Sequence, residues 1–250
     1  MRRMSNKEYW NLIYNQKGVK QELCFLKRYA KIFMENFLGK KIFEYMNPYP
    51  DYLLWNVIYE KYMPKTKGLK VLEVGSAPGH HLVKLEQVFG FVPYGIEYSE
   101  SGVELNRRIF ISHGLNPDNV IYADFLSDEL HKQYREYFDI VISRGFIEHF
   151  TEVKEIIDKH INLLKKGGYL FVSIPNLRGF NYFLTWMFSR KSIATHNIMI
   201  MQKDRFFELF DRRRLSTLFC GYFGTFDFPL YRSLIDLPIP FMRTFLETSR

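Results

Sequence analysis

Short apolar runs alternate with amphipathic segments through the middle of the chain. Apolar runs of this length predict strands, and segments with apolar residues three or four positions apart predict helices. Strands that alternate with helices form βαβ units, in which the strands are parallel and the crossovers right-handed. We therefore predict an α/β domain with a mostly parallel central sheet and helices on both faces. The predicted strands are 69–74, 92–98, 119–123, 137–143 and 168–174, and the predicted helices are 79–89, 101–113, 127–135 and 151–164.

The predicted helix 151–164 has the clearest boundaries. Thr151 is expected to be its N-cap, and Gly167-Gly168 is expected to stop it. His160 lies on the apolar stripe of this helix and is predicted to be a core histidine.

The pattern changes on both sides of the alternating segment. Residues 1–66 are predicted to be a helical, aromatic N-terminal extension, and residues 67–175 the core. Residues 176–250 are predicted to complete the same domain with an irregular stretch, a helix at 203–219 and an aromatic strand at 222–228. No final strand is evident in the proline-containing tail, so either that strand is irregular or the chain stops short of a full domain. An open sheet edge would favour a homodimer.

Composition narrows the class of protein without selecting a partner. The hydrophobic share of 47% and the charged share of 25% are ordinary for a globular protein. The net charge of +8 indicates an anionic partner: a nucleic acid, an acidic small molecule or a membrane surface. The 2 cysteines have no metal-type spacing, which fits a reducing cytoplasm. Phe180–Phe188 is about half a membrane span, so peripheral membrane contact is the most that it predicts, and we expect a cytoplasmic protein.

The segment 71–81 predicts a ligand site where the first strand meets its helix. Its Gly-bounded turn would present backbone N–H groups at a helix N-terminus. A dinucleotide fingerprint needs a glycine where this chain has His80, and the Gly-Lys-Ser/Thr of a P-loop is absent. An acidic residue also closes the next apolar run, at Glu97. Together these features indicate a nucleotide-type ligand other than a dinucleotide.

The spacing Glu73-x-Gly75-x-Ala77-x-Gly79 resembles motif I of the class I S-adenosylmethionine (SAM)-dependent methyltransferases. Further segments follow in that family's order over roughly residues 69–175. They are Glu97 at the end of the second strand, Ala123-Asp124-Phe125 after the third, Ser143-Arg144-Gly145 after the fourth, and Leu163–Leu170 leading into the fifth.

The resemblance implies a Rossmann-like fold that binds SAM and releases S-adenosylhomocysteine (SAH). It implies that Glu97 binds the ribose hydroxyls and Asp124 the adenine amino group, while the loop after the fourth strand borders the methionine part. Glu73 could instead only cap its turn, and Asp124 could be an ordinary helix N-cap. No metal site is expected. The expected cofactor-binding residues are Glu73, Gly75, Ser76, Ala77, Gly79, Glu97, Tyr98, Asp124, Phe125, Ser143, Arg144 and Gly145.

Near the N-terminus, Glu8-Tyr9-Trp10 resembles a short aromatic motif that precedes the core in many family members. There it can fold over the methionine end of SAM. The alternative is that these aromatic residues only hold an extra helix on the domain.

SAM carries the reactive group, so a dedicated base is not required for methyl transfer. His149 follows the fourth strand and is the candidate general base, because its ordinary pKa suits proton transfer near neutral pH. A role in packing is the alternative. The residues after the fourth strand exclude the Asn/Asp-Pro-Pro-Tyr/Phe motif of DNA amino-methyltransferases.

The acceptor is expected to bind the segments that flank the core. These segments are rich in aromatic and basic residues, which favours a small anionic, sugar-like or aromatic acceptor methylated on oxygen or nitrogen. Ile174-Pro175-Asn176, with the aromatic insert behind it, resembles small-molecule and sugar-pathway methyltransferases. One alternative is an RNA methyltransferase that uses Arg212–Arg214. The other is a non-catalytic SAM-binding or interaction domain.

Overall fold

The computed structural model describes residues 2–22, 49–188 and 190–224. The chain divides into two compact units. The first comprises residues 1–29 and 64–174, and the second residues 30–63 and 175–250.

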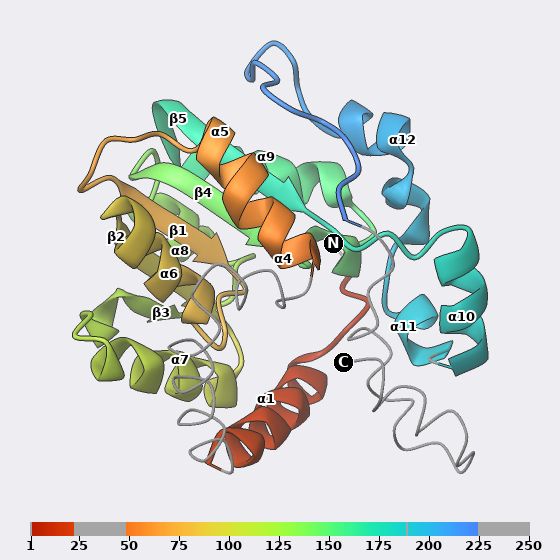
Figure 1. The fold of residues 1–250 in the computed structure, drawn as a ribbon, viewed down its shortest axis with the longest axis horizontal. Coiled ribbons are helices and arrows are strands. Elements are labelled where there is room, and N and C mark those ends of the chain that lie inside the picture. Colours follow the sequence, from red (N-terminus) through yellow and green to blue (C-terminus); the bar gives the residue numbers. More distant parts are fainter. Residues whose placement is uncertain (1, 23–48, 189, 225–250) are drawn as a thin grey trace, which may run out of the picture. The chain divides into compact units, whose positions relative to one another are not determined.

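A parallel sheet of five strands forms the centre of the first unit (Figure 1). The strand order is β3-β2-β1-β4-β5, and every neighbouring pair is parallel. The chain winds outward from β1 to β3 and then, on the other side of β1, from β4 to β5. This doubly wound α/β arrangement confirms the Rossmann-like fold predicted from the sequence. The strands are β1 (Lys70–Val74), β2 (Val92–Glu97), β3 (Val120–Tyr122), β4 (Phe138–Arg144) and β5 (Leu164–Ser173).

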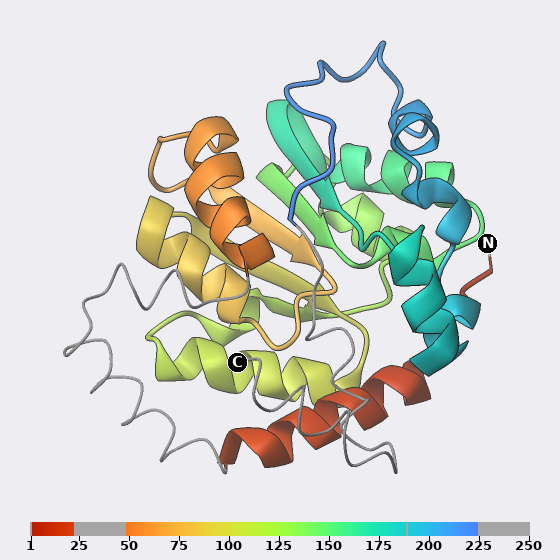
Figure 2. The same cartoon turned by 45° about the vertical axis from the view of Figure 1, so that its right-hand side comes forward.

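Helices cover both faces of this sheet, as right-handed crossovers require when the winding direction reverses. α6 packs against β2, α7 against β2 and β3, and α9 against β4 and β5 (Figure 2). The N-terminal helix α1 packs against α7. The elements of this unit besides the strands are α1 (Lys7–Glu22), α6 (His80–Phe89), α7 (Glu100–Ser112), η2 (Pro117–Asn119), α8 (Asp128–Gln133), η3 (Ile147–His149) and α9 (Val153–Leu163).

The two central strands, β1 and β4, are buried along most of their length. Both faces of a parallel sheet are covered, so such strands carry continuous apolar runs. Lys70 and Asp139 lie at the amino ends of these strands, and Glu73 and Ser143 lie near the carboxyl ends, where Val74 of β1 pairs in register with Ser143 of β4. The side chains with no exposed surface in these strands include Val71, Leu72, Val74, Ile140, Val141 and Ile142.

Two predicted boundaries of α9 are wrong, although His160 is buried in the core as predicted. The hydroxyl of Thr151 donates to the carbonyl of Arg2 instead of capping the helix, which begins at Val153. Gly167-Gly168 does not stop the helix, because β5 starts directly after it and contains both glycines. β5 has more residues than β4 between Leu164 and Tyr169, and the pairing of the two strands shifts register there.

The second unit is helical in its described part. The predicted helix 203–219 ends early, at Glu208. The Asp211 carboxylate accepts the N–H of Arg213, and this local turn competes with helix continuation. Residues 222–224 form no strand, and the rest of the predicted strand 222–228 lies outside the described residues. The elements are α4 (Tyr49–Leu53), the π-helix η1 (Leu54–Tyr59), α5 (Glu60–Tyr62), α10 (Phe180–Phe188), α11 (Arg190–Ala194), η4 (Ile198–Met201) and α12 (Lys203–Glu208).

None of the helices in the described ranges is long and apolar enough to cross a membrane. α10 does expose Phe180, Phe183 and Trp186, and the guanidinium of Arg190 lies 4.8 Å from the Trp186 ring centroid. Aromatic and basic residues are typical of surfaces that contact lipid head groups. Peripheral membrane contact therefore stays a prediction.

Candidate functional site

The turn between β1 and α6 brings the backbone close to two neighbouring segments. Gly75 and Gly79 have φ angles of +72° and +101°, which residues with a Cβ rarely adopt. A Cβ at Gly75 would lie 3.1 Å from the ring of Phe146, and one at Gly79 only 2.2 Å from Oδ1 of Asn106. These glycines therefore let the turn pack against the loop after β4 and against α7.

Glu73 lies in β1, just before this turn, and is buried. Its Oε1 lies 3.0 Å from Nδ1 of His81, at the start of α6. Its Oε2 has no hydrogen-bond partner among the described residues. The side chain of Ser76 is directed toward α7, where its Oγ accepts from the side-chain amide of Asn106 at 2.6 Å.

Glu97 ends β2 with a buried carboxylate. Its Oε1 accepts the backbone N–H groups of Tyr98 at 3.0 Å and Ser99 at 2.8 Å, and the carboxylate also accepts the N–H of Ala77. Burial raises the pKa of Glu97 to about 7, and the backbone hydrogen bonds oppose that rise. The group is therefore a fixed acceptor whose charge changes near neutral pH.

Helix α1 lies against the carboxyl end of β2. Oδ1 of Asn11 accepts from the hydroxyl of Ser99 at 2.7 Å. Tyr14 is buried, and both its burial and the carboxylates of Glu97 and Glu73 raise the pKa of its phenol. Tyr14 therefore lies near both acidic residues of the site, which the sequence analysis did not predict.

Trp10, one turn before Tyr14 in α1, reaches the loop after β4. Its ring is edge-on to that of His149 at a centroid distance of 5.3 Å and stacks on Tyr14 at 6.0 Å. Its indole N–H donates to Ser5 at 3.1 Å. The aromatic motif therefore holds α1 on the core and also borders the loop that carries the candidate base.

The loop after β4 contains a glycine with a positive φ angle and buried polar groups. Gly145 has a φ of +62°, and its N–H donates to the carbonyl of Ser173 at 2.8 Å. Arg144 pairs in register with that same Ser173 at the end of β5. Ser143 is fully buried, and its hydroxyl has no hydrogen-bond partner within the described ranges.

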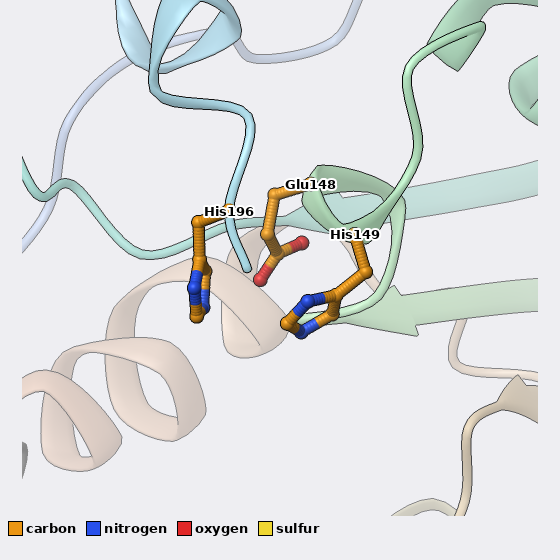
Figure 3. Close-up of side chains that lie close together, drawn as sticks. All are labelled: Glu148, His149 and His196. Atoms are coloured by element: carbon orange, nitrogen blue, oxygen red, sulfur yellow. The ribbon is translucent and has the colours of Figure 1, made fainter. Parts of the chain in front are cut away.

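Glu148 and His149 occupy consecutive positions in η3 (Figure 3). Both are buried. Burial raises the pKa of Glu148 to about 8, and its Oε2 lacks a hydrogen-bond partner in the part of the chain that the structure describes. Glu148 was not among the site residues predicted from the sequence. Its signal was an acidic residue inside the apolar stretch 146–150.

Asp124 follows β3 and is not a helix N-cap. Its Oδ1 accepts the N–H of Leu126 at 2.8 Å, while Ser127 is the residue that precedes α8. The same oxygen pairs with the guanidinium of Arg3. The neighbouring Phe125 is buried and packs edge-to-face on Phe146, at a centroid distance of 5.4 Å.

The acceptors at this edge of the sheet match the donors of SAM. Buried polar atoms in native proteins are almost always paired, so the unpaired oxygens of Glu73 and Ser143 call for a ligand or water. The Glu97 carboxylate suits a diol, and a positively charged amino group suits Glu73. The glycine turn permits close approach of a ligand to the backbone. The residues present therefore fit this cofactor.

Comparison with known proteins agrees with this geometry. A family profile described as "Methyltransferase domain" matches residues 41–222. The chain is 26% identical over 109 residues to a ubiquinone biosynthesis O-methyltransferase of Shewanella sp. (strain ANA-3), covering 44% of each chain. It is 31% identical over 127 residues to the enzyme of that name from Glaesserella parasuis serovar 5 (strain SH0165), covering 48% of this chain and 52% of that one. The chain thus spans about half the length of the curated relatives that it matches.

Solved structures resemble the chain over a similar extent. The PH0226 protein from Pyrococcus horikoshii OT3 is 27% identical, with a TM-score of 0.43. The similarity covers 50% of this chain and 56% of that protein.

Proposed function

The chain belongs to the class I SAM-dependent methyltransferase family, and we propose that it transfers the methyl group of SAM to an oxygen atom of a small acceptor. The observation that carries this proposal is the buried Glu97 carboxylate, fixed by backbone N–H groups beside the glycine turn. When bound, SAM supplies an activated methyl group on a sulfonium, and SAH is the product.

Each part of the cofactor has an acceptor or a close backbone segment in this proposal. Glu97 accepts from the ribose hydroxyls, and Oε2 of Glu73 accepts from the amino group of the methionine part. The backbone of the turn from Gly75 to Gly79 would lie against the cofactor, because a glycine-rich turn before a helix permits close approach of a ligand. The remaining predicted residues divide into the adenine end, with Tyr98, Asp124 and Phe125, and the methionine end, with Ser143, Arg144 and Gly145. Ser76 and Ala77 act through the shape of the turn.

His149 is the proposed general base. It lies in the loop after β4, where the resemblance places the methionine end of the cofactor, and it is buried against Trp10. A neutral imidazole there accepts the proton of an acceptor hydroxyl. The aromatic residues of α1 exclude water from this end of the site.

The acceptor class rests on the relatives and on composition. The curated relatives are named for O-methylation in ubiquinone biosynthesis, which supports an oxygen nucleophile on a small molecule. The chain also has exposed aromatic and basic side chains of the kinds that suit a small anionic or aromatic acceptor, such as Trp186 and Arg190.

The cofactor assignment is tested by calorimetric titration with SAM and SAH. Glu97→Gln keeps the shape of the side chain but removes the charge that two hydroxyls would share. Hydrogen bonds to charged groups contribute roughly 1.5–3 kcal/mol, so we expect binding to weaken by about tenfold or more. Glu104→Gln is the matched control, because this exposed residue in α7 pairs only with Arg108 among the described residues.

Three results would count against the proposal. Absence of SAM and SAH binding by the well-folded parent would remove the cofactor assignment. Equal affinities in both variants and the parent would show that the cofactor does not use Glu97. Binding without methyl transfer to any small acceptor would favour the non-catalytic alternative.

A further inference from the structure

Residues 2–4 form a strap along the loop after β4, within the first unit. Arg3 makes an antiparallel β-bridge with Phe150, and the N–H of Met4 donates to the carbonyl of His149 at 2.8 Å. These contacts join residues that are separated in sequence by almost the whole length of the unit. The strap therefore closes over the carboxyl edge of the sheet, beside the candidate base.

The side chain of Arg3 extends from this strap to the adenine end of the proposed site. Its guanidinium lies 4.8 Å from the ring centroid of Tyr98 and pairs with Oδ1 of Asp124. A second ring, that of Phe150, lies 5.9 Å away. A guanidinium is planar, stacks on aromatic faces and donates to carboxylates.

We propose that Arg3 occupies the place of adenine and that the strap must release for the cofactor to bind. This inference rests on the proposed function, which assigns Tyr98 and Asp124 to the adenine end. Adenine is also planar and offers an exocyclic amino group as donor. Both groups therefore compete for the same ring and the same carboxylate.

The ion pair that holds the Arg3 side chain at Asp124 is weak enough for a ligand to displace it. The Asp124 side chain is 45% exposed, and ion pairs at such positions contribute little. When only a fraction of molecules is competent to bind, the apparent dissociation constant rises by the inverse of that fraction. The strap therefore lowers cofactor affinity and sets a threshold for loading.

The first test compares SAH affinity in Arg3→Ala and Arg2→Ala by calorimetry. SAH lacks the sulfonium charge of SAM, so loss of one positive side chain has little direct effect on it. Arg2 joins the strap through its backbone and has an exposed side chain, which makes it the control for charge and for the substitution itself. We expect Arg3→Ala to bind SAH about three- to tenfold more tightly than the parent, and Arg2→Ala to match the parent.

The second test is amide hydrogen exchange with and without saturating SAH. The N–H groups of Met4 and Thr151 both donate across the strap, to His149 and Arg2. Release of the strap predicts faster exchange at both amides when SAH is bound.

Slower exchange at these amides, or unchanged or weaker SAH binding by Arg3→Ala, would overturn the proposal. In that case SAH binding by the parent would leave the proposed function standing. Absence of SAH binding by every form would instead remove the proposed function, and the strap proposal with it.

Discussion

The carboxylate of Glu97 is held by the backbone at the carboxyl end of β2. Burial opposes its charge, while N–H donors from Ala77, Tyr98 and Ser99 favour it, and burial has the larger effect. The same N–H groups fix its orientation, so the proposed ligand would meet an acceptor that is already placed. Such preorganisation strengthens binding without new contacts.

Cofactor affinity should therefore depend on pH. The pKa of Glu97 is about 7, above the ordinary 4.5, so the carboxyl gains a proton as the pH falls below 7. A ligand that needs the ionised form should bind about tenfold more weakly at pH 6 than at pH 8. Calorimetric titration of SAH across this range checks the slope.

Glu148 titrates in the same range, with a pKa of about 8. The variant Glu97→Gln separates the two carboxyls, because it should remove most of the pH dependence. A slope that survives in this variant would assign the effect to Glu148 or to another group.

His149 is the second residue whose role can be isolated. His149→Gln keeps a polar side chain next to Trp10 but removes the base. We expect kcat to fall by about 10²–10⁴, with SAH affinity within twofold of the parent. The assay is methyl transfer from labelled SAM to a small acceptor that the parent methylates. If kcat and SAH affinity fall together, the role of His149 is in packing. If kcat stays within a few-fold of the parent, His149 is not the general base.

At the level of elements, the start of α6 packs against α7. Gly79 is the residue before α6, and Asn106 of α7 faces it. Ser76 of the turn accepts from the amide of the same Asn106. The start of α6 and the middle of α7 are thus packed together next to the turn proposed to bind the cofactor.

Two glycines allow this packing to be measured. Gly79→Ala places a Cβ 2.2 Å from Asn106 Oδ1 at a φ of +101°, whereas Gly114→Ala, at a φ of +72°, meets nothing within 4 Å. Left-handed strain costs roughly 1–2 kcal/mol at either site, and overpacking adds about 1–3 kcal/mol at Gly79 alone. Urea unfolding of both variants should show the larger loss for Gly79→Ala, with SAH binding impaired only there. Equal losses would show that the contact between α6 and α7 relaxes freely.

At the level of the whole molecule, the net charge of +8 leaves the choice between small acceptors and RNA to experiment. Arg212, Arg213 and Arg214 are exposed, but Arg213 pairs with Asp211, so at least part of this cluster is neutralised within the chain. Neither RNA binding nor a homodimer follows from the described residues. Both stay predictions.

The acceptor proposal predicts where label from SAM will appear. In a cell extract the label should enter the low-mass fraction, and Arg212→Gln/Arg213→Gln/Arg214→Gln should not change its amount. Label that enters RNA, disappears with ribonuclease and falls in this variant or at higher salt would contradict a small acceptor.

Local pattern determined much of the first unit. Buried parallel strands need continuous apolar runs, so all five strands of the described sheet were predicted. Most of their predicted boundaries lie within a few residues of the observed ones. Gly75, Gly79 and Glu97 were identified because turn geometry and a polar strand end leave a local mark in the sequence. The start of β5 was missed because its register shift depends on pairing with β4.

Only the tertiary structure decided what the N-terminal segment does. The contacts of Arg3 with Asp124 and of Trp10 with His149 join residues more than a hundred positions apart. Periodicity reports which face of an element is buried, but not which distant element covers it. The burial of Glu148 has the same origin, since a carboxylate in a short loop loses its solvent only when other segments enclose it. The sequence by itself thus determined the strands of the sheet and its glycine turn, and long-range packing decided which distant segments lie against them.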